Sequence, residues 1–175
     1  MDEDKKIIDI EPGLRLRHLN VDDAENLFAL IDNDREYLGR WVPFTGLTNT
    51  SDDSRAFIAS SANDRLTGAQ YGYGIELGGQ LVGHISLMHI LDGQDPEIGY
   101  WIASRVARRG IMTKSVIALT RFGFEVLQID RLVIKADLGN IASNKVAQKS
   151  GFVLGGHTYD EDNNETINIW MLLEQ

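Results

Sequence analysis

The amino-acid sequence predicts an α/β fold (α+β in some classifications), with one mixed, mostly antiparallel sheet of about seven strands and helices on both faces. Two observations lead to this fold class. Apolar residues recur with the two-residue period of strands in some segments and the three-to-four-residue period of helices in others, in the order strand, two helices, three strands, helix, strand, helix, two strands. The length of 175 residues is that of one domain with a sizeable core, so we expect a single domain over residues 1–175.

The first third of the chain predicts one strand and two helices. Residues 14–17 alternate apolar and charged side chains, as a strand does. Asn20 can cap a helix that starts at Val21, where apolar residues follow at spacings of three and four. A second helix is predicted over 51–66, after a Ser-Asp-Asp cap signal, and the aromatic-rich stretch 37–44 is expected to be short helix and loop.

The middle of the chain predicts an antiparallel meander of three strands. Apolar residues alternate over 71–77, and Gly78-Gly79 then supplies a turn into a long apolar strand over 81–91. Asp92-Gly93 turns the chain again, into a third strand over 97–102.

The last third predicts a helix beyond Gly110, a buried strand, a second helix and a closing hairpin. The expected bounds are 131–136 for the strand, 140–150 for the second helix, 152–154 and 166–173 for the hairpin strands, and 160–164 for the polar turn between them.

Composition narrows the classes of function. The chain has no cysteine, which excludes disulfides, thiolate metal sites and a cysteine nucleophile, and we expect no metal. A formal net charge of −9 disfavours nonspecific binding to nucleic acid or anionic membrane and favours cationic partners such as amines or basic peptides. No apolar run reaches the roughly 18 residues of a membrane span, and residues 1–6 lack a signal-peptide pattern. We therefore expect a cytoplasmic protein.

A basic segment between a predicted strand and a predicted helix carries the strongest functional signal. Four of the 17 Lys and Arg residues fall within positions 105–114, together with Gly110. Free N–H groups at a helix start bind phosphate, glycine lets an anion approach the backbone, and arginine adds charge-assisted hydrogen bonds. A solvated basic turn is the alternative. Neither Gly-x-x-x-x-Gly-Lys-Ser/Thr nor Gly-x-Gly-x-x-Gly occurs, so the phosphate would belong to something other than a typical NTP or NAD.

The sequence Ala-Arg-Arg-Gly-Ile-Met at 107–112 resembles the Arg/Gln-x-x-Gly-x-Gly/Ala pyrophosphate loop of the GNAT superfamily of N-acetyltransferases, which bind acetyl-CoA. Ala107 replaces Arg/Gln, and Met112 replaces Gly/Ala. Further stretches are similar to the RimJ/RimL-type branch, which acetylates the N-terminal amines of ribosomal proteins; they are 97–102, 111–114 and 140–152. The order of elements from Leu14 to Leu173 also suits this fold, so the resemblance covers nearly the whole chain.

The resemblance implies acetyl-CoA as co-substrate, with its pantetheine arm between two splayed strands, 97–102 and 131–136. Backbone donors near Tyr100, Trp101 and Ile102 would bind the thioester and polarise its carbonyl; core packing would also explain the side chains of Tyr100 and Trp101. Asn140 would contact the arm, and a plain helix cap is the alternative for it. The cofactor-binding residues implied in the loop are Ala107, Arg108, Arg109, Gly110, Ile111, Met112 and Thr113.

The resemblance also implies direct transfer, in which a neutral amine attacks the thioester carbonyl and no acetyl-enzyme forms. Many relatives carry a tyrosine seven residues after the asparagine to protonate the leaving thiolate, and this position is Ala147 here. Ser143 lies one turn earlier on the same helix face, and we expect its hydroxyl to act as the acid.

Several candidates are open for the general base. Some relatives carry a glutamate five residues before the asparagine, where this chain has Lys135. Glu97, at the start of the strand that leads to the thioester, is the first candidate and would act through a water. His84 and His89 are alternatives. An unassisted amine is a further one, since a peptide α-amine with a pKa of about 7.7–8.0 is partly neutral at cellular pH.

We therefore expect an acetyl-CoA-dependent N-acetyltransferase whose acceptor is the N-terminal α-amine of a protein or peptide, such as a ribosomal protein. The aromatic residues at 41–44 and the acidic groups at 32–36 and 160–162 could flank the acceptor. One alternative is a small amine, polyamine or aminoglycoside as acceptor. Another is a noncatalytic acyl-CoA-binding module; measuring turnover with a panel of amines would distinguish such a module from an enzyme. Trp41 and Phe44 add large apolar side chains beyond what one small sheet needs, so we also expect a homodimer.

Overall fold

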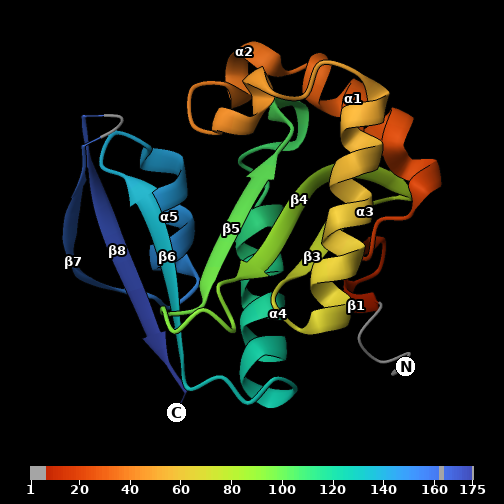
Figure 1. Cartoon of the computed structure of the whole chain (residues 1–175). Helices are drawn as coiled ribbons and strands as arrows, with labels where there is room; N and C mark the ends of the chain where they lie inside the picture. The colour runs from red at the N-terminus through yellow and green to blue at the C-terminus, as the bar shows by residue number, and fades with distance from the viewer. Residues whose placement is uncertain (1–6, 162–163, 175) are drawn as a thin grey trace.

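In the computed structural model, which describes residues 7–161 and 164–174, eight strands form one sheet in the order β1-β2-β3-β4-β5-β6-β8-β7 (Figure 1). Neighbouring strands are antiparallel except for β5 and β6. The strands are β1 (Ile7–Glu11), β2 (Leu14–Arg17), β3 (Tyr71–Leu77), β4 (Gln80–Met88), β5 (Glu97–Ile102), β6 (Arg131–Asp137), β7 (Val153–Asp160) and β8 (Glu165–Leu173). The mixed, mostly antiparallel sheet predicted from the sequence is confirmed.

Helices cover both faces of this sheet, as predicted. The α-helices are α1 (Ala24–Asp32), α2 (Arg35–Leu38), α3 (Ser51–Thr67), α4 (Ile111–Glu125) and α5 (Ile141–Lys149), and short 3-10 helices lie at Val21–Asp23, Pro43–Gly46 and Ser104–Val106. In Figure 1, α1 and α3 lie in front of the sheet and α4 lies behind it. The main core, which includes the fully buried Val116 and Leu119 of α4, also takes in Ala147 of α5. A smaller core joins α1 and α3 to Trp101 of β5.

Three strands differ from the sequence-based expectation. The sequence analysis does not anticipate β1, an edge strand whose side chains are largely exposed and which turns into β2 through Gly13, at φ 82°. β4 ends at Met88 and not at 91, because His89 adopts φ 61°, a left-handed conformation that a strand cannot continue. β7 continues to Asp160, and part of the polar turn expected at 160–164 lies outside the described residues.

β5 and β6 are parallel neighbours that separate from each other. A single residue pair joins them, Glu97 with Val133. Beyond this pair the two strands diverge toward the top of Figure 1. Each strand stays paired on its other side, β5 with β4 and β6 with β8. The result is an opening between two fixed walls, where splayed strands were expected.

Three surface findings bear on partners. Within the described ranges, no helix combines the length and the apolar character needed to cross a bilayer. The same residues contain no cluster of three or more His, Cys, Asp or Glu side chains that could hold a metal ion. Of the two aromatic residues on which the homodimer prediction rests, Trp41 is 43% exposed and Phe44 packs inward against Trp101. The homodimer stays a prediction.

An ion-pair network fixes the start of α1 to the sheet. Arg17 donates two hydrogen bonds to the Asp23 carboxylate, at 2.8 and 2.7 Å, and one to Glu76 at 2.7 Å. Asp23 also accepts the N–H of Asn20 at 2.8 Å, which closes a capping box. The hydrogen bonds from Arg17 hold the pKa values of Asp23 and Glu76 below their ordinary range.

Protonation of these carboxylates should therefore weaken the fold. Because their pKa values are lower in the folded chain, their contribution is complete above the ordinary values near pH 4 and is lost as the pH falls through the folded values. We expect Asp23→Asn to destabilise the protein by roughly 1–2 kcal/mol at about pH 6 and by less at about pH 3, in urea unfolding. Asp22→Asn, at the exposed neighbouring position, is the control. An Asp23→Asn deficit that persists undiminished in acid would contradict this account.

Candidate active site

The basic loop between β5 and α4 is buried at its two ends and exposed between them. Val106 and Ile111 are buried, while residues 108–110 are exposed. Gly110 at φ 76° and Arg108 at φ 64° both adopt left-handed backbone conformations. Such a conformation is strained for arginine, and strain of this kind collects at ligand-binding loops. Nothing lies within 4 Å of the place where a Cβ at Gly110 would stand, so an anion can approach the backbone there.

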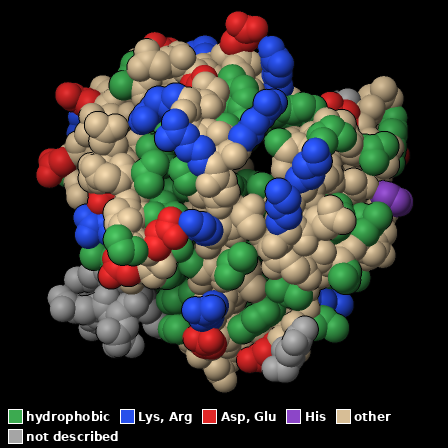
Figure 2. Space-filling view, turned by 180° about the vertical axis from the view of Figure 1, so that it is seen from behind, with side chains coloured by type: hydrophobic (Ala, Val, Ile, Leu, Met, Phe, Trp, Pro, Cys, Tyr) green, Lys and Arg blue, Asp and Glu red, His purple; other side chains and the backbone are tan. Residues whose placement is uncertain are grey.

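The loop presents hydrogen-bond donors of two kinds. The first N–H groups of α4, at 111–113, have no partner within the helix and lie at the positive end of its dipole. The exposed Arg108 and Arg109 form no ion pair within the described part of the chain, whereas Lys114 is paired with Glu11 at 2.7 Å. On the face that α4 covers, Lys and Arg side chains gather around a hollow (Figure 2). This combination suits a pyrophosphate.

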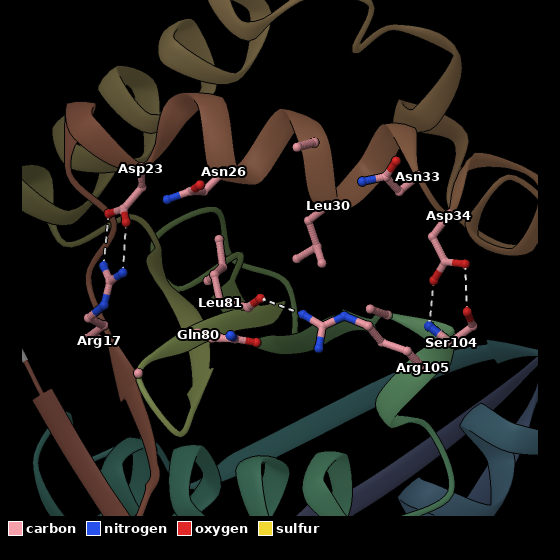
Figure 3. Close-up of a pocket in the computed structure, with 13 residues that line it drawn as sticks. Arg17, Asp23, Asn26, Leu30, Asn33, Asp34, Gln80, Leu81, Ser104 and Arg105 are labelled. Atoms are coloured by element: carbon pink, nitrogen blue, oxygen red, sulfur yellow. Dashed lines mark hydrogen bonds and ion pairs between the residues drawn. The ribbon is translucent and has the colours of Figure 1, made fainter.

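Asp34, just after α1, fixes the start of this loop. Its carboxylate accepts hydrogen bonds from the N–H of Ser104 and from the Ser104 hydroxyl, the latter at 2.7 Å (Figure 3). The two residues border a polar cleft of about 530 Å³ between α1, the β3–β4 turn and residues 103–105. Neither Tyr100 nor Ser143 lines this cleft. Asp34 therefore contacts the start of the basic loop, although the sequence analysis considered it for the acceptor side.

The diverging end of β5 turns alternate backbone groups toward the opening. The N–H of Ala103 bonds to Val82 O at 2.8 Å, so in this antiparallel ladder Trp101 also faces β4. The backbone groups of Tyr100 and Ile102 point the other way, where the ladder with β6 has already ended. Tyr100 and Ile102 thus offer main-chain groups to a ligand in the opening, and the Trp101 backbone does not.

Helix α5 forms the opposite wall and is tied to the sheet through Asn144. The Asn144 amide donates to two backbone carbonyls, at 2.8 and 2.9 Å, and its Oδ1 accepts from Asn168 at 2.6 Å and from the indole N–H of Trp170 at 2.9 Å. Asn140 caps the helix by accepting the N–H of Ser143 at 3.1 Å. Contact of Asn140 with the pantetheine arm stays a prediction.

Ser143 contacts Tyr100 between α5 and β5. The Tyr100 hydroxyl lies 3.0 Å from Ser143 Oγ and 3.1 Å from the Ser143 carbonyl oxygen. Burial raises the pKa of Tyr100 to about 12, so the phenol is neutral at physiological pH. Ala147, one turn further along α5, is completely buried in the core, whereas Ser143 is half-buried.

An apolar cavity of about 310 Å³ lies on the face of β4 and β5 that α1 and α3 cover, opposite the face covered by α4 and α5. Phe44, Trp101 and Phe57 form part of its wall, and its lining within the described residues includes no Asp, Glu, Lys or Arg. His84 is buried there with its ring 5.3 Å from that of Phe57, and burial lowers the pKa of His84 to about 4. Tyr100 also lines this cavity, while its side chain packs against the main core on the opposite face of the sheet, where its hydroxyl contacts Ser143.

Glu97 lies on the same face of β5 as this cavity, beside Lys135 of β6. Its carboxylate is 2.9 Å from the Lys135 ammonium, and its side chain is 16% exposed. The carboxylate therefore lies next to the residue that replaces the glutamate of some relatives. His89 lies in the turn after β4, where it contacts Asp92 at 2.7 Å. The role of Glu97 as base stays a prediction.

Residues 13–153 match the family model described as "Acetyltransferase (GNAT) domain". The chain belongs to the GNAT acetyltransferase family. It is accordingly an acetyl-CoA-dependent N-acetyltransferase, as the sequence analysis expected. The residues present fit this co-substrate, because the left-handed Gly110, the open start of α4 and the unpaired main chain of β5 lie along one path.

Curated relatives carry ribosomal names, which confirms the RimJ/RimL-type resemblance. YdaF of Bacillus subtilis (strain 168), provisionally named a ribosomal N-acetyltransferase, is 35% identical over 157 residues, covering 86% of this chain and 84% of that protein. The ribosomal-protein-serine acetyltransferase of Escherichia coli (strain K12) is 25% identical over 150 residues, covering 85% and 84%. The structure of RimL, a ribosomal L7/L12 alpha-N-protein acetyltransferase in complex with coenzyme A, has a TM-score of 0.88 at 24% identity over 96% of this chain and 98% of that one, and shares its fold.

Several polar contacts of the site are absent from the sequence-based account, and two of them join residues that are far apart in the chain. Asp34 and Ser104 are 70 positions apart, and Tyr100 and Ser143 are 43 apart. For the Tyr100–Ser143 contact, one indirect signal was present in the sequence. Strand alternation predicts that Tyr100 and Trp101 point to opposite faces of the sheet, so only one of them can face α5.

Gly110→Val should weaken acetyl-CoA binding with little further effect on the site. Valine at a positive φ strains the loop, and its side chain fills the space where a phosphate would approach. We expect the Kd from calorimetric titration to rise about tenfold or more, which corresponds to losing one charge-assisted hydrogen bond. Binding by the wild type should also weaken as salt is raised.

Gly68→Val is the matched control, because Gly68 has φ 77°, has open space at its Cβ position and caps α3 away from the loop. Both variants should lose similar stability in thermal unfolding, and only Gly110→Val should change the Kd. Equal Kd values for the two variants would rule out the loop as the phosphate site.

Proposed function

We propose that the protein transfers the acetyl group of acetyl-CoA directly to the N-terminal α-amine of a protein or peptide. The observation that carries this proposal is the uncharged cavity beneath α1 and α3, which meets the opening at Tyr100. The names of the relatives make ribosomal proteins the first acceptors to test. The proposal treats the whole chain as one catalytic domain.

An uncharged cavity favours an amine that is easily neutral. A peptide α-amine has a pKa of about 7.7–8.0, whereas that of a lysine side chain is about 10.4. Losing a proton before attack therefore requires less free energy for the α-amine. Polyamines and aminoglycosides carry several positive charges, which carboxylates would have to balance, and none lines the cavity within the described residues. The neutral His84 supplies no charge either.

The donor is held from the opposite side by groups of the loop and of β5. In this proposal Arg108, Arg109 and the N–H groups of 111–113 bind the pyrophosphate. The N–H of Tyr100 or Ile102 donates to the thioester oxygen, where negative charge develops during attack. Both substrates are then bound at once, and their positioning supplies much of the rate enhancement.

Two protons move during the transfer. The amine nitrogen forms a bond to the carbonyl carbon as the carbon–sulfur bond breaks, so the nitrogen loses a proton and the sulfur gains one. We propose that Ser143 donates its hydroxyl proton to the leaving sulfur and that Glu97 accepts the amine proton through a water. The Tyr100–Ser143 contact and the place of Glu97 on the acceptor face support these roles.

A panel of amines with acetyl-CoA tests the proposal through thiol release. We expect turnover with peptides that have a free α-amine, little with the same lysine-containing peptides blocked at the N-terminus, and little with spermidine or an aminoglycoside. Double-reciprocal plots of the initial rate against one substrate, at several concentrations of the other, should give intersecting lines, because both substrates must be bound together. Turnover with polyamines alone would contradict the acceptor assignment. Acetyl-CoA binding without turnover on any amine would point to a noncatalytic module.

A further inference from the structure

Asn140 and Tyr100 together contact the N–H, the carbonyl oxygen and the hydroxyl of Ser143. Asn140 accepts its N–H at 3.1 Å, and the Tyr100 hydroxyl lies 3.1 Å from its carbonyl oxygen and 3.0 Å from its Oγ. Tyr100 belongs to β5 and Ser143 to α5, so this contact joins the two walls of the opening directly.

We propose that Tyr100 is a positioning residue for Ser143, whose phenol holds Oγ so that the serine proton points toward the leaving sulfur. This inference rests on the acid role proposed for Ser143. Tyr100 itself gives up no proton in the reaction. Ser143 transfers its own proton to the sulfur as the carbon–sulfur bond breaks, and it regains a proton from solvent after the thiol leaves.

The chemistry of the two hydroxyls supports this division of roles. A serine within a helix readily turns its hydroxyl toward a carbonyl of the preceding turn, which would direct its proton away from the opening. The Tyr100 phenol carries one hydrogen and lies within hydrogen-bond distance of both the carbonyl oxygen and Oγ of Ser143, and either hydroxyl can be the donor in the second contact. When the phenol donates to Oγ, the serine proton is free for another acceptor, and this is the arrangement that the proposal requires. Because burial raises the pKa of Tyr100 to about 12, the phenol keeps its proton over the working pH range. The positioning contact should therefore be independent of pH.

Tyr100→Phe removes the hydroxyl and keeps the ring. We expect kcat to fall about tenfold, as the loss of one aligned hydrogen bond allows, while the KM for acetyl-CoA stays within about twofold. The limbs of the pH–rate profile should stay where they are in the wild type. Tyr71→Phe is the matched control, since Tyr71 is buried on β3 and packs against Phe122 away from α5, and it should leave kcat unchanged.

The double variant separates positioning from general packing. If Tyr100 acts through Ser143, Tyr100→Phe should have almost no further effect on kcat in a Ser143→Ala background. An equal loss of kcat in both backgrounds would overturn the proposal, as would a Tyr100→Phe enzyme with wild-type kcat. Thermal unfolding of each variant shows whether a loss of rate reflects a loss of folded protein.

A second reaction, the hydrolysis of acetyl-CoA, tests the role of Tyr100 without depending on which amine is the acceptor. Slow thiol release from acetyl-CoA with water as the acceptor uses the same leaving group and needs no amine. The coupling between Tyr100 and Ser143 should appear there as well, even if N-terminal peptides prove to be the wrong acceptors. If the effects of Tyr100→Phe and Ser143→Ala are independent in both reactions, the positioning role is rejected, and the proposed acceptor is not affected. If the peptides are not acetylated but the two substitutions are coupled in hydrolysis, only the proposed acceptor is rejected.

Discussion

The separation of β5 from β6 after a single residue pair is the constraint on which the site depends. A sheet that stayed paired here would use the main-chain groups of Tyr100 and Ile102 internally, and no ligand could reach them. Because the strands diverge after Glu97 and Val133, these groups face an opening instead. The two remaining ladders, β4 with β5 and β6 with β8, keep both walls rigid.

The other features of the site hold the edges of this opening in place. Asp34 fixes the loop that leaves β5, and Asn144 ties α5 to β8. Tyr100 and Ser143 join the two walls at one point, beside the apolar cavity. The basic loop lies on one face of the sheet, and the cavity on the other face has no Asp, Glu, Lys or Arg in its described lining. In the proposed reaction, a polyanionic donor and a neutral amine therefore approach the same point from opposite sides.

Local signals predicted most of the fold and the position of the basic loop. Alternation in β3 to β5, helix caps such as Asn20 and the basic loop around Gly110 each act within a few residues, and the structure follows them. The edge strand β1 was not anticipated, although Ile8 and Ile10 alternate with Asp9 and Glu11 and pack against the main core. Contacts such as Asp34 with Ser104 bring together residues 70 positions apart, and no local spacing encodes them. The sequence also could not show that the Trp101 backbone faces β4, since that depends on the hydrogen-bond phase of the ladder.

Amide hydrogen exchange of β5, followed by NMR with and without acetyl-CoA, tests the central claim most directly. The Tyr100 and Ile102 amides should exchange quickly in the free protein and become strongly protected when acetyl-CoA binds, because the ligand then occupies the opening. The Trp101 amide, which faces β4, should be protected in both states. Protection at the start of α4 with no change at Tyr100 and Ile102 would show that the donor binds the loop but does not lie between the strands.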